Sequence, residues 1–316
     1  MNILITGCNG MLGREFYPVL KEKGYKIYGI DNLLDKKNKY RFDEFYYGDV
    51  ADKEQMRKQI VEICKPHIIL HCAAWTDVDA CEKDKDKAKR INSEGTKIIA
   101  SFAKEINALI CYISTDFIFD GKKQSPYIES DKPHPINVYG ETKLKGEEAI
   151  KRSGASYIIV RTSWLFGGDK QSNNFVNAII NQYDSGETLR VVDDQKGRPT
   201  YTRDFAQAVI KVIEFYKDKK DVHEIVHIAN EGEISWFKFA QLIVEKIGGD
   251  TSQVIAIPST KLNRAAKRPK NSVLNTEKYE GDFEDKLRSW QFGLDEYINK
   301  LKIEKKIEKE YLHYHE

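Results

Sequence analysis

Residues 2–13 read NILITGCNGMLG, an apolar run followed at once by glycines in the spacing G-x-x-G-x-x-G. The run 2–6 is typical of a buried strand, and residues 11–23 carry apolar side chains at helical spacing. Glycines at a strand-to-helix turn let the backbone approach a pyrophosphate, whose charge the first helical amides would face. The stretch therefore predicts a dinucleotide-binding turn with contacts at Gly7, Asn9, Gly10, Met11, Leu12 and Gly13.

The chain continues with short apolar runs that alternate with amphipathic stretches. The predicted strands are 2–6, 25–30, 67–74, 108–114 and 156–162, and the predicted helices are 11–23, 52–64, 82–106 and 136–152. Nearly continuous apolar strands separated by helices are typical of a parallel sheet that is covered on both faces. We therefore predict an α/β fold with a Rossmann-type, doubly wound parallel sheet.

The pattern is less regular beyond residue 165. It predicts helices near 173–184, 204–217 and 235–247, strands near 188–192 and 222–229, and a long basic loop at 259–278. We assign 1–165 and about 204–230 to a dinucleotide-binding domain. A smaller, interleaved C-terminal substrate domain takes 166–203 and 231–300, and a charged tail takes 301–316.

Further cofactor contacts are predicted where strands end. Asp31 follows the second strand at the position where an acid meets the adenosine ribose, and a carboxylate there would repel a 2′-phosphate, which favours NADH over NADPH. The alternative is a tight turn in which Asp31 caps the loop. Asp49 and Val50 could contact the adenine, and small residues after strand 67–74 leave room for a dinucleotide, although they could equally serve packing. This last group is Ala73, Ala74 and Trp75.

Tyr139 and Lys143 lie four residues apart in a predicted helix, so their side chains are neighbours. The Lys143 charge and an oxidised nicotinamide would lower the pKa of the Tyr139 phenol, which could then exchange a proton with a carbonyl group as hydride is transferred. Ser114, Thr115 and Asp116 lie at the carboxyl end of strand 108–114 and converge on the same crevice, where Thr115 would hold the carbonyl oxygen. An accidental Tyr-Lys pair is the alternative.

Composition and charge narrow the remaining classes. The net charge is only +2 and the basic residues are interspersed with acids, so we expect no nucleic-acid binding. The first residues, MNILITG, have neither a basic leader nor a membrane-spanning length, so we expect a cytoplasmic protein. The five cysteines form no C-x-x-C pair. His223 and His227 match H-E-x-x-H, but on a strand they would stand roughly 13 Å apart, so we predict no metal site.

Several longer motifs occur in order: INSEGT with Asn92, STDFIFDG, PINVYGETKLKGE, RTSWLFG, DQKGRPT and RPKNSVLNTEK. With the glycine motif they resemble the extended short-chain dehydrogenases/reductases and, more narrowly, the dTDP-4-dehydrorhamnose reductase family, from residue 3 to about 295. The resemblance implies that NADH or NADPH reduces dTDP-4-dehydro-6-deoxy-L-mannose to dTDP-L-rhamnose. It implies Tyr139 as proton donor, Lys143 as its electrostatic partner and Thr115 at the carbonyl.

The resemblance also implies that Asp116 and Trp164 touch the sugar, although Trp164 could instead fill the core. Asn174, Arg198, Arg268 and Lys270 are candidates for the nucleotide diphosphate, because cationic donors suit its charge.

Some members of the family are magnesium-linked dimers, so a homodimer is compatible with the resemblance. Gln291 stands where those members have an acid, and we predict no such metal, although Glu15 is present. Phe117 replaces the glutamate that a related 4,6-dehydratase needs, which disfavours elimination. The sequence leaves three further classes open: an epimerase, a 4-ketoreductase that acts on another dTDP-deoxyhexose, and a non-catalytic dinucleotide-binding subunit.

Overall fold

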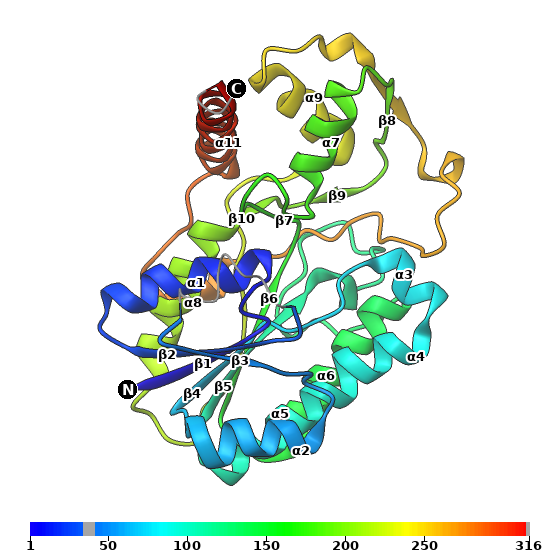
Figure 1. Cartoon of the computed structure of the whole chain (residues 1–316). Helices are drawn as coiled ribbons and strands as arrows, with labels where there is room; N and C mark the ends of the chain where they lie inside the picture. Colours follow the sequence, from blue (N-terminus) through cyan, green and yellow to red (C-terminus); the bar gives the residue numbers. More distant parts are fainter. Residues whose placement is uncertain (34–41, 314–316) are drawn as a thin grey trace.

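The computed structural model describes residues 1–33 and 42–313, with side chains up to residue 305. Its centre is a seven-stranded sheet in the order β11-β6-β5-β4-β1-β2-β3, in which every pairing is parallel (Figure 1). The strands are β1 Asn2–Thr6, β2 Lys26–Asp31, β3 Glu44–Tyr47, β4 Ile68–His71, β5 Leu109–Thr115, β6 Tyr157–Thr162 and β11 His223–His227. The chain adds strands in one direction from β1 to β3 and then in the other from β4, as a doubly wound sheet does.

Helices cover both faces of this sheet (Figure 1). Ile3 and Ile5 of β1 pack with α1 (Met11–Glu22) and α8 (Thr202–Tyr216), whereas Leu4 packs on the opposite face with η1 (Arg57–Cys64), α5 (Thr96–Glu105) and α6 (Val138–Ser153). Successive strand residues point to opposite faces, so a continuous apolar run serves two cores. The predicted α/β class and doubly wound parallel sheet are confirmed.

Strand β3 was not predicted. Its sequence, EFYY, starts with a charge and is only partly buried, because β3 lies at the edge of the sheet. An edge strand buries less surface and carries a weaker apolar signal than the central strands.

The prediction of one helix over 82–106 was wrong. The segment divides into α3 (Val78–Lys83), α4 (Lys85–Ala88), a π-helical turn (Lys89–Gly95) and α5. Asp84 leaves the helical conformation, and its carboxylate accepts a hydrogen bond from the Lys87 amide. Aspartate often competes in this way with the helix for backbone donors, and it starts a new helix here. The predicted helix 52–64 begins as α2 (Lys53–Met56) and continues directly into η1.

A second hydrophobic cluster lies among helices that Figure 1 shows at the top, away from the sheet. It joins α7 (Phe175–Asp184), α9 (Trp236–Lys246) and α11 (Trp290–His313) with the parallel pair β8 (Leu189–Val192) and β13 (Val254–Ile257). The shorter elements here are β7 Leu165–Phe166, β9 Lys196–Gly197, β10 Thr200–Tyr201 and β12 Ile234–Ser235, with 3-10 turns at Thr251–Gln253 and Ser259–Lys261; α10 (Glu277–Phe283) packs on the sheet side.

Helix α11 includes most of the predicted charged tail, so residues 301–313 continue a helix that starts at Trp290. Residues 314–316 lie outside the described part of the chain. Within the described residues, no helix combines the length and the apolar character that crossing a membrane requires.

The H-E-x-x-H segment forms β11, as predicted. His227 is buried and its ring contacts the Tyr127 carbonyl, whereas His223 is exposed. Among the described residues, no three His, Cys, Asp or Glu side chains are grouped so that they could hold a metal ion.

Candidate active site

The glycine-rich turn between β1 and α1 has a shape that side chains would destroy. Gly7 has φ +67°, and a Cβ there would lie 2.7 Å from the Ala73 backbone; a Cβ on Gly13 would lie 2.7 Å from Cys8 Cα. The Gly10 amide donates to the Gly7 carbonyl at 3.1 Å. Gly10, at the N-cap of α1, offers no side chain to the first helical amides. These residues therefore fit a dinucleotide pyrophosphate, which would meet the amides at the start of α1.

Asp31 supports this turn from the end of β2. Its carboxylate accepts hydrogen bonds from the Asn9 amide at 2.8 Å and from the Leu33 amide at 2.9 Å, and the side chain is buried. Burial raises the pKa of the Asp31 carboxyl, and these amides oppose the increase. The contacts match the loop-capping alternative, and the NADH preference inferred from Asp31 stays a prediction.

The other predicted cofactor residues lie along the same edge of the sheet. Asn92 exchanges hydrogen bonds with the backbone of Trp75, at 2.8 Å and 3.0 Å, and fixes the segment after β4. Val50 is buried beside Gly95, and Asp49 pairs with Arg90 at 2.8 Å. Met11 and Leu12 begin α1, where Met11 contacts Gly168, and Ala73 and Ala74 follow β4.

Tyr139 stands in the first turn of α6. The Asn137 side chain caps that helix by accepting from the Gly140 amide at 2.8 Å, and it donates to the Lys267 carbonyl at 2.8 Å. A Cβ on Gly140 would collide with the Phe117 carbonyl, so α6 begins in close contact with the end of β5. The cap and the glycine place Tyr139 beside Thr115, whose hydroxyl interacts with the phenol.

Lys143 is almost fully buried one turn later. Its ammonium donates to the Ile113 carbonyl at 2.7 Å and lies 4.0 Å from the centre of the Tyr112 ring. Burial lowers the pKa of Lys143 to about 7, and the Glu147 carboxylate opposes this decrease. The lysine is therefore held against β5, close to the end of the strand.

In the structure the Tyr139 phenol is buried beside Thr115 and Asp116. The predicted decrease in its pKa depends on an oxidised nicotinamide as well as on Lys143, and it stays a prediction. Burial raises the pKa of the phenol well above its ordinary value, the hydrogen bond with Thr115 opposes the increase, and the Asp116 carboxylate adds to it. The ionisable carboxyl that acts on the phenol is that of Asp116, whereas the Lys143 ammonium donates to the Ile113 carbonyl.

Thr115 and Asp116 are linked at the end of β5. The Thr115 hydroxyl donates to Asp116 Oδ1 at 3.0 Å and accepts from the Phe117 amide at 3.2 Å. Asp116 is 2% exposed, and burial raises the pKa of its carboxyl to about 7. Its other oxygen, Oδ2, is buried and has no hydrogen-bond partner in the described part of the chain.

Ser114 faces a buried network that sequence reasoning missed. Its hydroxyl donates to Glu147 Oε1 at 2.6 Å, and Arg161 of β6 donates to both Glu147 oxygens, at 3.1 Å and 2.8 Å. Glu147 and Arg161 are 0% and 1% exposed. The available signals were an arginine in the apolar run 156–162 and an acid one helical turn after Lys143.

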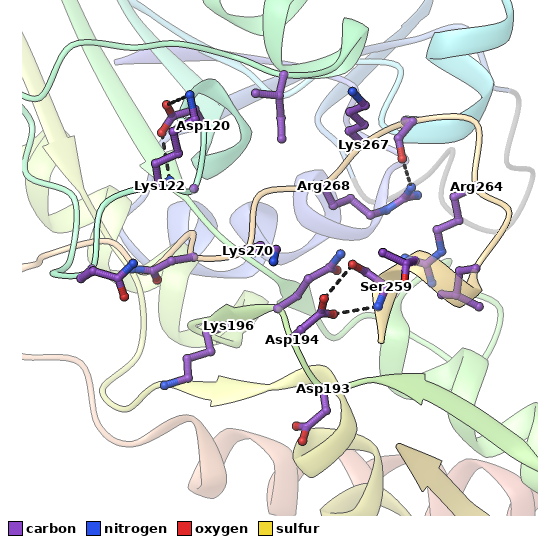
Figure 2. A pocket seen from close by; sticks show the side chains of 18 of the residues that line it. Asp120, Lys122, Asp193, Asp194, Lys196, Ser259, Arg264, Lys267, Arg268 and Lys270 are labelled. Carbon is purple, nitrogen blue, oxygen red and sulfur yellow. Dashed lines mark hydrogen bonds and ion pairs between the residues drawn. The ribbon is translucent and has the colours of Figure 1, made fainter. Parts of the chain in front are cut away.

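A cavity of about 920 Å³ is lined by the basic loop and by residues of the segments 120–124 and 193–196 (Figure 2). Arg264, Lys267 and Arg268 come from the basic loop, and Lys196 lies nearer Asp193 and Asp194 across the cavity. Ser259 anchors the loop by donating twice to the Asp194 carboxylate. The cavity lining does not include Thr115, Asp116 or Tyr139 themselves; it includes Ile136 and Asn271, which adjoin Asn137 and Ser272 in the chain.

Two of the four candidate diphosphate residues, Arg268 and Lys270, line this cavity. The Arg268 guanidinium is held by both oxygens of Asp79, at 3.0 Å and 2.6 Å, which links the basic loop to α3. Asn174 and Arg198 are not part of the lining. Asn174 is buried as the cap of α7, and Arg198 donates to the Thr276 hydroxyl at 3.0 Å.

Trp164 lies between β6 and β7 in an unusual conformation, with φ +48°. Its ring stacks on Trp236, with the centroids 3.4 Å apart, and lies against Gly197. A positive φ at a bulky residue is strained and persists only where packing imposes it. Trp164 is only partly buried against the second hydrophobic cluster, so its contact with the sugar stays a prediction beside the core-filling alternative.

Comparisons with known proteins agree with this arrangement. The family model described as the RmlD substrate binding domain matches residues 1–303. The dTDP-4-dehydrorhamnose reductase of Escherichia coli K12 is 34% identical over 306 residues, which cover 95% of this chain and 98% of that protein. The chain belongs to the dTDP-4-dehydrorhamnose reductase family.

Other relatives extend the agreement. The spore coat polysaccharide biosynthesis protein SpsK of Bacillus subtilis is 35% identical, covering 94% of this chain and 96% of that protein. The crystal structure of the dTDP-4-dehydrorhamnose reductase of Clostridium acetobutylicum superposes with a TM-score of 0.82 at 37% identity, covering 96% of this chain and 100% of that one. The crystal structure of the Bacillus anthracis dTDP-4-dehydrorhamnose reductase in complex with NADP superposes with a TM-score of 0.82 at 34% identity, covering 94% of this chain and 98% of that one. The predicted family and its oxidoreductase class are confirmed.

Proposed function

We propose that this protein reduces the C4 keto group of dTDP-4-dehydro-6-deoxy-L-mannose to give dTDP-L-rhamnose, with Tyr139 as the proton donor. The observation that carries the proposal is the meeting of Tyr139 and Thr115 at the carboxyl end of β5, with Lys143 buried one helical turn away. In open α/β sheets ligands bind outside this edge. The family and the printed names of the relatives support a dTDP-sugar as substrate.

The glycine turn, Asp49, Val50 and Asn92 would hold a nicotinamide dinucleotide, which supplies the hydride when bound. The Bacillus anthracis relative was crystallised with NADP. Comparing KM for NADH and NADPH would test the preference for NADH.

In the proposed reaction, Tyr139 gives its proton to the C4 carbonyl oxygen, and the Thr115 hydroxyl donates a hydrogen bond to the same oxygen. A phenol whose pKa is raised holds its proton until the oxygen becomes basic as hydride arrives. Lys143 would offset the charge left on Tyr139 after the transfer.

The cavity lined by the basic loop suits the nucleotide part of the substrate. Lys196, Arg264, Lys267 and Lys270 line it and form no ion pair with another residue of the described chain, so they could neutralise a diphosphate. We propose, accordingly, that residues 166–203 and 231–300 form the substrate domain. Asp116 would contact the sugar beside C4.

The test is oxidation of the reduced cofactor with dTDP-4-dehydrorhamnose, followed by the absorbance of the nicotinamide. We expect Tyr139→Phe to bind cofactor normally and to lose kcat by roughly 10²–10⁴-fold, the usual contribution of a general acid. Tyr157→Phe, at the opposite end of the sheet, is the matched control. Unchanged turnover in Tyr139→Phe would exclude the mechanism. NMR of the product would separate rhamnose from its C4 epimer and so exclude or retain the other ketoreductases.

A further inference from the structure

The Thr115 hydroxyl has three polar neighbours, and its single hydrogen cannot point at Asp116 and at a substrate carbonyl at the same time. A hydroxyl has one hydrogen and two acceptor positions. The Phe117 amide occupies one acceptor position, and the hydrogen goes to Asp116 Oδ1. The Tyr139 phenol is the third neighbour, and in this arrangement it can bond to Thr115 only by donating its own hydrogen.

With an ionised Asp116, this arrangement opposes the proposed reaction. The Thr115 hydrogen points at a carboxylate and the Tyr139 hydrogen points at Thr115, so neither faces a carbonyl oxygen. Both donors become available if Asp116 carries a proton. The acid then donates to the second acceptor position of Thr115, the Thr115 hydrogen turns outward, and the Tyr139 hydrogen is released.

We propose that Asp116 is a positioning residue which, in its neutral form, orients the Thr115 hydroxyl and thereby frees the Tyr139 proton for the substrate carbonyl. The proposal rests on the proposed roles of Tyr139 and Thr115. Asp116 exchanges no proton with substrate in this scheme. It changes only the direction of two hydrogen bonds.

The surroundings of Asp116 favour the neutral acid. The side chain is 2% exposed, and Oδ2 accepts no hydrogen bond of ordinary length from the described residues, although the Ser272 hydroxyl lies near the carboxyl. Burial raises the pKa of the carboxyl to about 7, and contacts with Ser272 and Thr115 limit the increase. The acid and its ion therefore interconvert near neutral pH.

The groups that face this site are few. Tyr139 on α6 faces Asp116, Cys81 on α3 faces Tyr139, and Ser272 approaches from the basic loop. Lys143 is held at the Ile113 carbonyl, and its own pKa is also near 7, so the test must separate the two titrations.

The variant Asp116→Asn makes that separation, because an amide can donate to Thr115 at every pH and does not titrate. With the full-length enzyme, cofactor and dTDP-4-dehydrorhamnose, we expect wild-type kcat to fall by roughly 30-fold between about pH 6 and about pH 8.5, for a group titrating near 7. Asp116→Asn should change less than about 3-fold over the same range. Asp116→Ala, which lacks the donor, should be slow throughout.

Asp218→Asn, an identical change at an exposed position of the described chain, should keep the wild-type profile. The proposal is overturned if Asp116→Asn falls with pH as wild type does, which would assign the titration to Lys143, or if it is as slow as Asp116→Ala at every pH.

A second measurement does not need turnover. The infrared difference between wild type and Asp116→Asn should show a protonated carboxyl band that disappears with an apparent pKa near 7. A carboxylate at all pH values above about 5 would refute the positioning role. If wild type does not reduce the sugar but the band is present, the proposed function fails while the hydrogen-bond arrangement stands.

Discussion

The buried pair between Glu147 and Arg161 gives the sharpest test of how this site is held together. Both side chains are within 1% of complete burial, and Glu147 receives three hydrogen bonds, two from Arg161 and one from Ser114. Glu147→Gln keeps the shape of the side chain but leaves the buried Arg161 charge without an opposite charge. Breaking a buried pair in this way costs about 3–5 kcal/mol. We expect about 3 kcal/mol, because the amide oxygen still accepts one bond.

Urea denaturation would measure this free energy of unfolding. Glu105→Gln is the matched control, because Arg57 and Glu105 form an equally bidentate pair at 2.9 Å and 2.7 Å with side chains 50% and 40% exposed. Exposed pairs contribute about 0–1 kcal/mol. Adding Arg161→Met to Glu147→Gln should recover part of the loss by removing the stranded charge. The reasoning is refuted if Glu147→Gln is no more destabilising than Glu105→Gln.

Three further predictions concern the turn, the acid and the basic loop. Gly13→Ala should weaken cofactor binding at least about 10-fold, measured by calorimetry, because the added Cβ would collide with Cys8. Gly281→Ala is the control, since a Cβ there has no atom within 4 Å and should leave the affinity unchanged. Equal affinities of the two variants would contradict this prediction. Burial raises the pKa of the Asp116 carboxyl from 3.8 to about 7, so the stability given by the neutral acid is complete below pH 3.8 and is lost as pH rises through 7. The free energy of unfolding of Asp116→Asn should therefore rise by up to about 4 kcal/mol relative to wild type between these pH values. Denaturation at a series of pH values would measure this, and parallel curves for the two proteins would disprove it. Asp79→Asn should release Arg268 and raise KM for the dTDP-sugar several-fold with little change in kcat, and a loss confined to kcat would contradict this link.

Local sequence was sufficient for the central sheet and the cofactor turn. The strands β1 and β5 have apolar centres and are buried along almost their whole length. Gly7 and Gly13 are required by backbone geometry within a few residues of each other. The sequence-based prediction failed at two places where the local pattern was weak: the partly buried edge strand β3, and Asp84, whose side chain interrupts a predicted helix.

What the sequence by itself determined was therefore the chain order of the central strands other than β3, the glycine turn expected to bind a dinucleotide, and the placement of Tyr139, Lys143 and Thr115 near one sheet edge. Only the tertiary structure decided which charge each group faces. It turned Lys143 to the Ile113 carbonyl, placed the buried Asp116 carboxyl beside Tyr139 and paired Glu147 with Arg161. The physical reason is that periodicity and glycine geometry act over a few residues, whereas burial and electrostatic environment arise from contacts between segments that are distant in the chain.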